Sequence, residues 1–151
     1  MTEPEMAAAI FKRFNDVFPA AALAALGVAV PYAFENQPRP ESTPFAYVEI
    51  LDGDSEEWTI GPRAKVRREG TIVVRLTGAP DVGRKQLDLL AQVVRDVYER
   101  RHLYQPAPGP GEDGVALHAA TVTVVRGDRD RDQLRVVNVG ISFDWYETRG
   151  S

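Results

Sequence analysis

The fold is indicated most strongly by LRVVNVGISFDWYE, residues 134–147. Large apolar residues stand at every second position, which is the period of a β-strand with one buried face. These residues are Val137, Val139, Ile141, Phe143 and Trp145. The stretch predicts a long strand whose apolar face is covered by other parts of the chain.

A second long strand is predicted just before this one, over residues 115–126. The alternating charges of GDRDRD, residues 127–132, indicate a turn that joins the two strands. Residues 105–114 carry three prolines and three glycines, and they are predicted to form a loop without regular structure.

A helix is predicted ahead of this loop, over residues 82–101. Its apolar positions recur at helical spacing and are Leu87, Leu90, Val94, Val97 and Tyr98. Asp81 suits the N-cap of this helix. Three cations suit its C-terminal end, where the helix dipole favours positive charge: Arg95, Arg100 and Arg101.

The N-terminal segment predicts another helix, over residues 3–26. Its apolar face carries Met6, Ile10, Phe11, Phe14 and Val17. Pro4 fits a first turn, where its missing N–H costs nothing, and Gly27 is placed to end the helix. Pro19 is expected to break or kink the run and leave a second short piece through Ala25.

Shorter strands are predicted between the two helices. Residues 28–34 form a short extended piece before a proline-rich loop, and residues 45–51 alternate as a strand. The sequence DGDS at residues 52–55 predicts a turn, after which a short strand opens over residues 57–60. A further strand over residues 71–77 carries on one face Ile72, Val74 and Leu76.

The predicted order is a helix, three or four strands, a second helix and two strands. This order favours an α+β fold in which two main helices pack on one face of a mixed, mostly antiparallel sheet. The 151 residues, 44% hydrophobic and 26% charged, match the size and composition of a single soluble domain over residues 1–151.

Charge and cysteine content narrow the functional classes. The net charge of −4 gives no bulk attraction to nucleic acid, and the absence of cysteine excludes disulfides, zinc–thiolate sites and cysteine nucleophiles. Glu3 and Glu5 stand where a secretory signal would be positive, and the apolar stretch from Ala20 to Val30 is too short to span a bilayer. We expect a soluble, unexported protein without a membrane partner.

The sequence shows no recognisable set of catalytic residues. His102 is expected to cap the second helix, and His118 to lie in a strand among apolar residues. None of the serines stands in a nucleophile-elbow motif; they are Ser42, Ser55 and Ser142. The acidic group does not follow the ligand order of a calcium loop; it comprises Asp52, Asp54, Glu56 and Glu57. We interpret the acidic group as a solvated turn and predict no catalytic residue, no cofactor, no metal and no enzyme activity.

A basic run forms the best candidate contact surface: Arg63, Lys65, Arg67 and Arg68. Two interpretations stay open, a solvated hairpin arm or a contact with an acidic partner surface or DNA phosphates. No aromatic residue alternates with these charges, which argues against a stacking platform for single-stranded nucleic acid.

Several segments, taken together and in order, resemble the tail terminator family of long-tailed phages. After the N-terminal helix come VPYAFEN (30–36), FAYVEI (45–50), WTIG (58–61), REGTIVV (68–74), APDVG (79–83) and VGISFDWY (139–146). The resemblance covers nearly the whole chain. The basic run at 63–68 and the loop at 105–114 do not match the family's pattern.

The resemblance implies a structural virion protein of the tail, made in the host cytoplasm. It would form a homohexameric ring that ends tail-tube polymerisation, and it would offer the surface onto which the head's connector, or head-completion protein, docks. Its partners would be further copies of itself, the tail tube protein and that connector, while DNA passes through the lumen without specific binding. Apart from the resemblance, the basic run predicts that residues 61–70 form an exposed arm or hairpin end that contacts a neighbouring subunit or the tube protein.

Three alternatives remain beside this interpretation. One is another head–tail joining, tail-completion or tube-like protein. A second is a small metal-dependent hydrolase that uses Asp52, Asp54, Glu57 and His118. A third is an adaptor domain that binds a protein partner through the face that carries Trp145.

Overall fold

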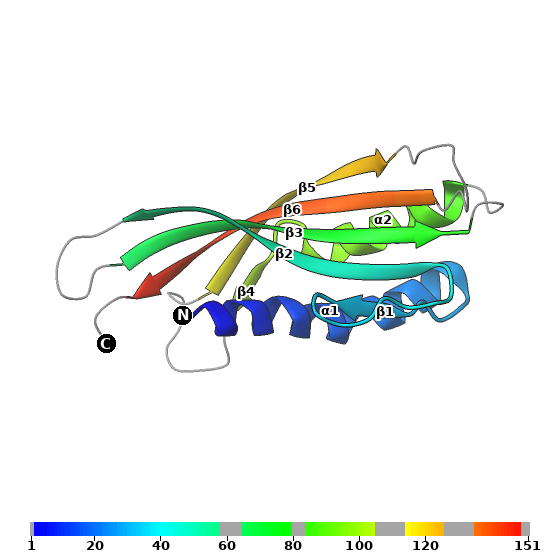
Figure 1. The fold of residues 1–151 in the computed structure, drawn as a ribbon, viewed down its shortest axis with the longest axis horizontal. Coiled ribbons are helices and arrows are strands. Elements are labelled where there is room, and N and C mark those ends of the chain that lie inside the picture. Colours follow the sequence, from blue (N-terminus) through cyan, green and yellow to red (C-terminus); the bar gives the residue numbers. More distant parts are fainter. Residues whose placement is uncertain (1, 58–64, 80–83, 105–113, 126–134, 149–151) are drawn as a thin grey trace.

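The computed structural model describes residues 2–57, 65–79, 84–104, 114–125 and 135–148 (Figure 1). Its elements are α1 (Glu3–Leu26), β1 (Tyr32–Phe34), β2 (Phe45–Glu57), β3 (Lys65–Gly78), α2 (Arg84–Tyr98), β4 (His102–Tyr104), β5 (Gly114–Val125) and β6 (Arg135–Thr148). The turn predicted at residues 127–132 and the Asp81 N-cap lie outside the described residues. So does the loop predicted at 105–114, except for Gly114, which begins β5.

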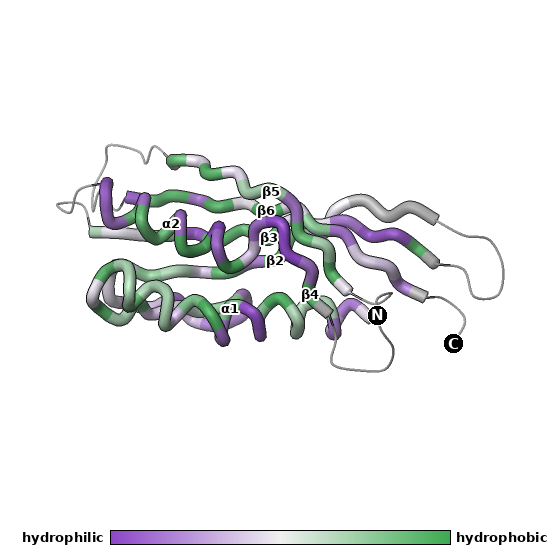
Figure 2. Tube along the Cα trace, turned by 180° about the vertical axis from the view of Figure 1, so that it is seen from behind, coloured by the Kyte–Doolittle hydropathy of each residue, from purple (hydrophilic) through white to green (hydrophobic). Residues whose placement is uncertain are grey.

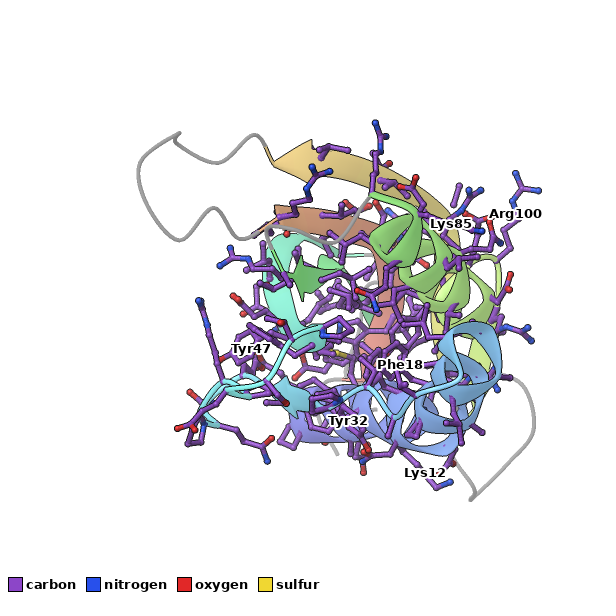
Figure 3. The ribbon with its side chains drawn as sticks, turned by 90° about the vertical axis from the view of Figure 1, so that its right-hand side faces the viewer. Lys12, Phe18, Tyr32, Tyr47, Lys85 and Arg100 are labelled. Carbon is purple, nitrogen blue, oxygen red and sulfur yellow. The ribbon has the colours of Figure 1, made fainter. Side chains whose placement is uncertain are left out.

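The strands form one sheet in the order β1-β2-β3-β6-β5-β4. β1 runs parallel to β2, and the other neighbours are antiparallel. Both helices lie on the same side of this curled sheet (Figure 3). The predicted α+β fold, with two helices on one face of a mixed, mostly antiparallel sheet, is confirmed.

The core lies between the helices and the sheet. The predicted apolar face of β6 is buried along its length, as is the β3 face that carries Ile72, Val74 and Leu76. All five predicted stripe positions of α2 are buried too. The two helices lie side by side in Figure 2, which views the molecule from behind. Two hydrogen bonds join them: Arg13 Nε donates to Val97 O at 3.0 Å, and Tyr98 Oη donates to Ile10 O at 2.7 Å.

The ends of α1 follow from its sequence. Thr2 caps the N-terminus through a capping box with Glu5, and Pro4 stands in the first turn. Gly27 adopts φ +74° and donates its N–H to Leu23 O at 2.8 Å, so it ends the helix as predicted. Neither α1 nor α2 combines the length and the apolar character that crossing a membrane requires.

The prediction that Pro19 divides this helix is wrong. α1 continues as one helix of 24 residues through Pro19. A proline inside a helix removes one backbone hydrogen bond. Phe18 and Ala22, on either side of it, are fully buried, and their packing holds the helix on the sheet.

The predicted end of α2 is also corrected. The helix ends at Tyr98, three residues before the predicted boundary, because Arg100 adopts a left-handed φ of +56°. His102 therefore does not cap the helix but opens the short edge strand β4. Arg101 does serve the helix end as expected, since its Nε donates to Asp96 O at 2.9 Å.

The turn predicted at residues 52–55 is wrong as well. β2 is one strand from Phe45 to Glu57, and its pairing with β3 shifts register between Asp52 and Ser55. The Gly-Asp sequence is absorbed as an irregularity of the β-bulge type, because pairing with β3 resumes beyond it, where Glu56 stands opposite Arg67. Residues 58–60 lie outside the described part of the chain.

Candidate functional site

Three of the four residues of the predicted basic surface lie at the start of β3. Arg63 lies outside the described residues, and Lys65 is the first residue of β3. Arg67 and Arg68 follow within that strand, where successive side chains point to opposite faces. The strand therefore separates these two arginines, and they do not form one continuous patch.

Arg67 lies on the sheet face away from the helices, within a network of charged groups. Its guanidinium contacts Asp144 Oδ2 at 3.0 Å from Nε and 2.9 Å from Nη2, and it also pairs with Glu69. His118 Nε2 lies 3.2 Å from the other oxygen, Asp144 Oδ1. The hydrogen bond to Asp144 raises the pKa of Arg67 above its ordinary value. Both oxygens of Asp144 are thus engaged within the subunit.

Arg68 lies on the opposite face and has a separate partner. It pairs with Glu147 of β6 and stands over the ring of Trp145, with 5.9 Å between the guanidinium carbon and the ring centroid. Trp145 is buried. The positive charge of Arg68 is therefore used at the edge of the core, where it covers an aromatic side chain.

A hollow of about 320 Å³ lies beside the Arg67 network. It is lined by Gly53, Arg67, Glu69, Gly70, Thr71, His118, Ser142, Phe143 and Asp144. Gly70 is required at this place, because a Cβ there would stand 2.5 Å from the ring of Phe143. The charged groups of this hollow contact one another, and within the described ranges no group of three or more His, Asp or Glu residues could hold a metal.

The prediction that His118 lies among apolar residues is wrong. Its side chain is exposed, because β5 shifts register against β6 between Leu117 and Ala120. The residues after α2 hold this irregular stretch: Arg100 N donates to His118 O at 3.1 Å, and Arg101 O accepts from Leu117 N at 2.8 Å.

Glu99 completes that junction between α2 and β5. Its Oε2 accepts from Ala120 N at 2.8 Å, and Arg95 contacts the same carboxylate. The bond from Ala120, followed by the one from Arg95, lowers the pKa of Glu99 below its ordinary value. Sequence reasoning missed this role, because Glu99 and Ala120 are 21 residues apart.

The acidic group proposed for the hydrolase alternative is only partly described. Asp52 is exposed on β2, while the side chains of Asp54, Glu56 and Glu57 lie outside the described residues. Ser42 and Ser142 are exposed. In the described part of the chain, His118 contacts Asp144 and not Asp52.

An apolar surface that the sequence did not single out lies on β5. Val122 and Val124 are 41% and 44% exposed, although their partners on β6, Val139 and Val137, belong to the core. Opposed residues of paired strands point to the same face. The two valines therefore extend the apolar face beyond the part that the helices cover.

Comparison with known proteins identifies solved structures with a similar fold. No protein-family model and no curated protein matches the chain. A solved chain whose title states no function matches with a TM-score of 0.65 at 14% identity, over 96% of both chains. A chain from a structure titled "Virion of native gene transfer agent (GTA) particle" matches with a TM-score of 0.55 at 16% identity, over 93% of both chains. The chain is similar in fold to these two proteins along nearly its whole length.

Proposed function

We propose that this chain is a structural protein of a virion and, more specifically, a tail terminator that closes the end of a tail tube as a homohexameric ring. The observation that carries the proposal is the fold shared along 93% of both chains with a component of a gene transfer agent virion. The order of the segments from residues 30–36 to 139–146 supports the terminator role.

The partners in this proposal are further copies of the chain, the tail tube protein and the connector of the head. The ring ends the growth of the tube and presents the surface onto which the connector docks. DNA passes through its lumen without specific binding, and the net charge of −4 suits that passage because it does not attract phosphates.

A structural role, without turnover of a substrate, is part of the proposal. Here Asp144 is used on both oxygens, by Arg67 and by His118. These contacts fasten β3, β5 and β6 to one another on the outer face of the sheet.

The basic segment offers a test of how the ring closes. A cyclic ring joins one patch of a subunit to a different patch of the next. Arg67 and Arg68 have carboxylate partners within the subunit, and their replacement would also remove those ion pairs. The test therefore uses the other two cations of the basic run, Arg63 and Lys65. The double variant Arg63→Ser/Lys65→Ser should fold normally but assemble more weakly than the natural chain.

The matched control for that test is Lys12→Ser, which removes an exposed cation from α1. Assembly is measured as the mass in solution at increasing salt, because screening weakens contacts between exposed charges. The variant should show a flatter salt dependence than the control. Equal assembly of both variants would show that the basic segment is solvated surface.

Deletion of the gene tests the function itself. A particle that lacks this protein should build normal heads, together with tails of uncontrolled length that do not join. Electron micrographs of the lysate measure both. Tails of normal length joined to filled heads would contradict the proposal, and purified protein that polymerises into open tubes would favour the tube-like alternative.

A further inference from the structure

The outer edge of β5 is unpaired over its C-terminal part among the residues that the structure describes. β4 pairs only with Gly114–Ala116, and the residues after α2 cover the edge as far as Ala120, whose N–H donates to Glu99. Beyond that point, no described strand lies beside Thr121–Val125, which we call the β5 edge.

The direction of the backbone groups on this edge follows from strand geometry. Ala120 N points away from β6, because it donates to Glu99. In a strand the N–H and C=O groups of alternate residues point the same way. Val122 and Val124 therefore direct their backbone donors and acceptors outward, and the same two residues expose their side chains.

Such an edge is a template for another strand. Natural proteins protect free edges with charged residues, prolines or bulges. The sequence from Ala119 to Val125, AATVTVV, contains no charged residue and no proline. Its β-branched residues favour a strand partner that buries the two valines.

The opposite edge of the same sheet supplies a candidate strand. β1 covers only Ala46–Val48 of β2, and Glu35 accepts from Ile50 N just beyond it. No described strand lies beside the following residues, Leu51–Glu57, which we call the β2 edge. Leu51 is 51% exposed there.

The two edges differ in charge. The β2 edge contains four acidic residues and no basic residue: Asp52, Asp54, Glu56 and Glu57. On the α2 side of the molecule, Lys85 and Arg100 point outward, opposite the β2 residue Tyr47 (Figure 3). Among the described residues, neither cation lies within ion-pair distance of a carboxylate, although the charge of Arg100 helps to lower the pKa of Glu99. A contact between the two edges therefore brings unlike charges together, while a β5–β5 contact brings like charges together.

The positions of the two edges also fit a closed ring. β1 and β4 cover opposite halves of the sheet, so the β2 edge and the β5 edge lie at opposite ends of the strands (Figure 1). Joining them shifts each subunit along the strand direction relative to the next. A closed sheet of tilted strands requires a stagger of this kind.

We infer that the β5 edge binds the β2 edge of a second copy of this chain as an added antiparallel strand. The inference rests on the proposed ring, and it names the two different patches that a ring requires. Backbone hydrogen bonds supply the pairing, and burial of Val122 and Val124 adds apolar contact. Asp52, which stands opposite Gly70 on the helix side of the β2 edge, then faces the side that carries Lys85 and Arg100.

Cross-linking tests this pairing, because the chain has no cysteine of its own. Asp52→Cys and Val124→Cys are prepared as separate variants and mixed under assembly conditions, with tail tubes present. A bismaleimide long enough to tolerate a shift of two residues is then added. The mixture should yield cross-linked dimers, while each variant alone should yield none.

A proline variant tests the same edge without a cross-linker. Val122→Pro removes an N–H that points away from β6, and an edge strand tolerates proline at such a position. The variant should keep the far-ultraviolet circular dichroism of the natural chain and lose at least tenfold in assembly affinity. Thr123→Lys, on the other face of β5, controls for a change at the same strand and should assemble normally.

The outcomes separate the inference from the proposed function. One outcome is that rings of six subunits form without the mixed cross-link and tolerate Val122→Pro. It would overturn the inference and leave the terminator role standing. Cross-links within Val124→Cys alone would show a β5–β5 contact and overturn it too. A natural chain that stays monomeric even on tube ends would overturn the ring and the inference together.

Discussion

On β6, Ile141 and Asp144 stand three residues apart and face opposite sides of the sheet. Ile141 is fully buried under the helices, whereas Asp144 binds Arg67 and His118 on the outer face. The first residue is held by many weak apolar contacts, and the second by a few directed polar ones. The helix-covered face therefore carries the stability of the fold, while the outer face and the strand edges are available for contacts with partners.

The largest expected effect breaks the helix-covered face. Ile141→Ala should lower the free energy of unfolding by about 2–5 kcal/mol, because it removes buried methyl groups and leaves a cavity. Chemical denaturation measures the loss. Ser142→Ala, the exposed neighbour on the outer face, should change the stability by less than about 0.5 kcal/mol. A loss below about 0.5 kcal/mol in the isoleucine variant would contradict the assignment of the buried face.

A smaller effect is expected between the two helices. Tyr98 is fully buried, and burial raises the pKa of its hydroxyl, which donates to Ile10 O. Tyr98→Phe keeps the ring and removes this hydrogen bond, so it should cost about 0.5–1.5 kcal/mol. The partly exposed Tyr47 provides the control as Tyr47→Phe. Equal stability of the two variants would mean that the bond from Tyr98 adds nothing to helix packing.

The smallest effect concerns the junction that holds β5. The hydrogen bonds of Glu99 lower its pKa in the folded state. Their contribution is therefore present above the ordinary glutamate pKa of about 4.3 and is lost as the pH falls through the lowered value. Glu99→Gln should lose stability near neutral pH and show a shallower decline on acidification.

The measurement for this junction is a series of denaturation curves between about pH 7 and pH 3, with the exposed Glu41→Gln as the control. The control should follow the natural chain throughout. A Glu99→Gln profile parallel to that of the natural chain would show that this carboxylate does not link α2 to β5.

The helix-covered face was largely predictable from the sequence, and the polar contacts were not. The burial of Ile72, Val74 and Ile141 is predicted by the recurrence of apolar residues at every second position of their strands. Arg67 and Asp144 are 77 residues apart, and their contact depends on the register of β3 against β6. No local pattern encodes that register, so the sequence alone favours one basic patch, although the strand separates Arg67 from Arg68.

The corrections have the same origin. The sequence at residues 52–55 and Pro19 carry strong local signals for a turn and for a helix break. Pairing with β3 overrides the first signal, and burial of Phe18 and Ala22 overrides the second. The short strand β4 was missed because its three residues pair only with β5 and show no period of their own.

The most direct test of the central claim is the number of copies that assemble at the end of a tail tube. Purified protein is mixed with tail tubes, and tube ends are averaged by electron microscopy while the mass of the released assembly is measured in solution. We expect a ring of six copies at one end of each tube, which then no longer grows. Unoccupied tube ends that continue to elongate would contradict it.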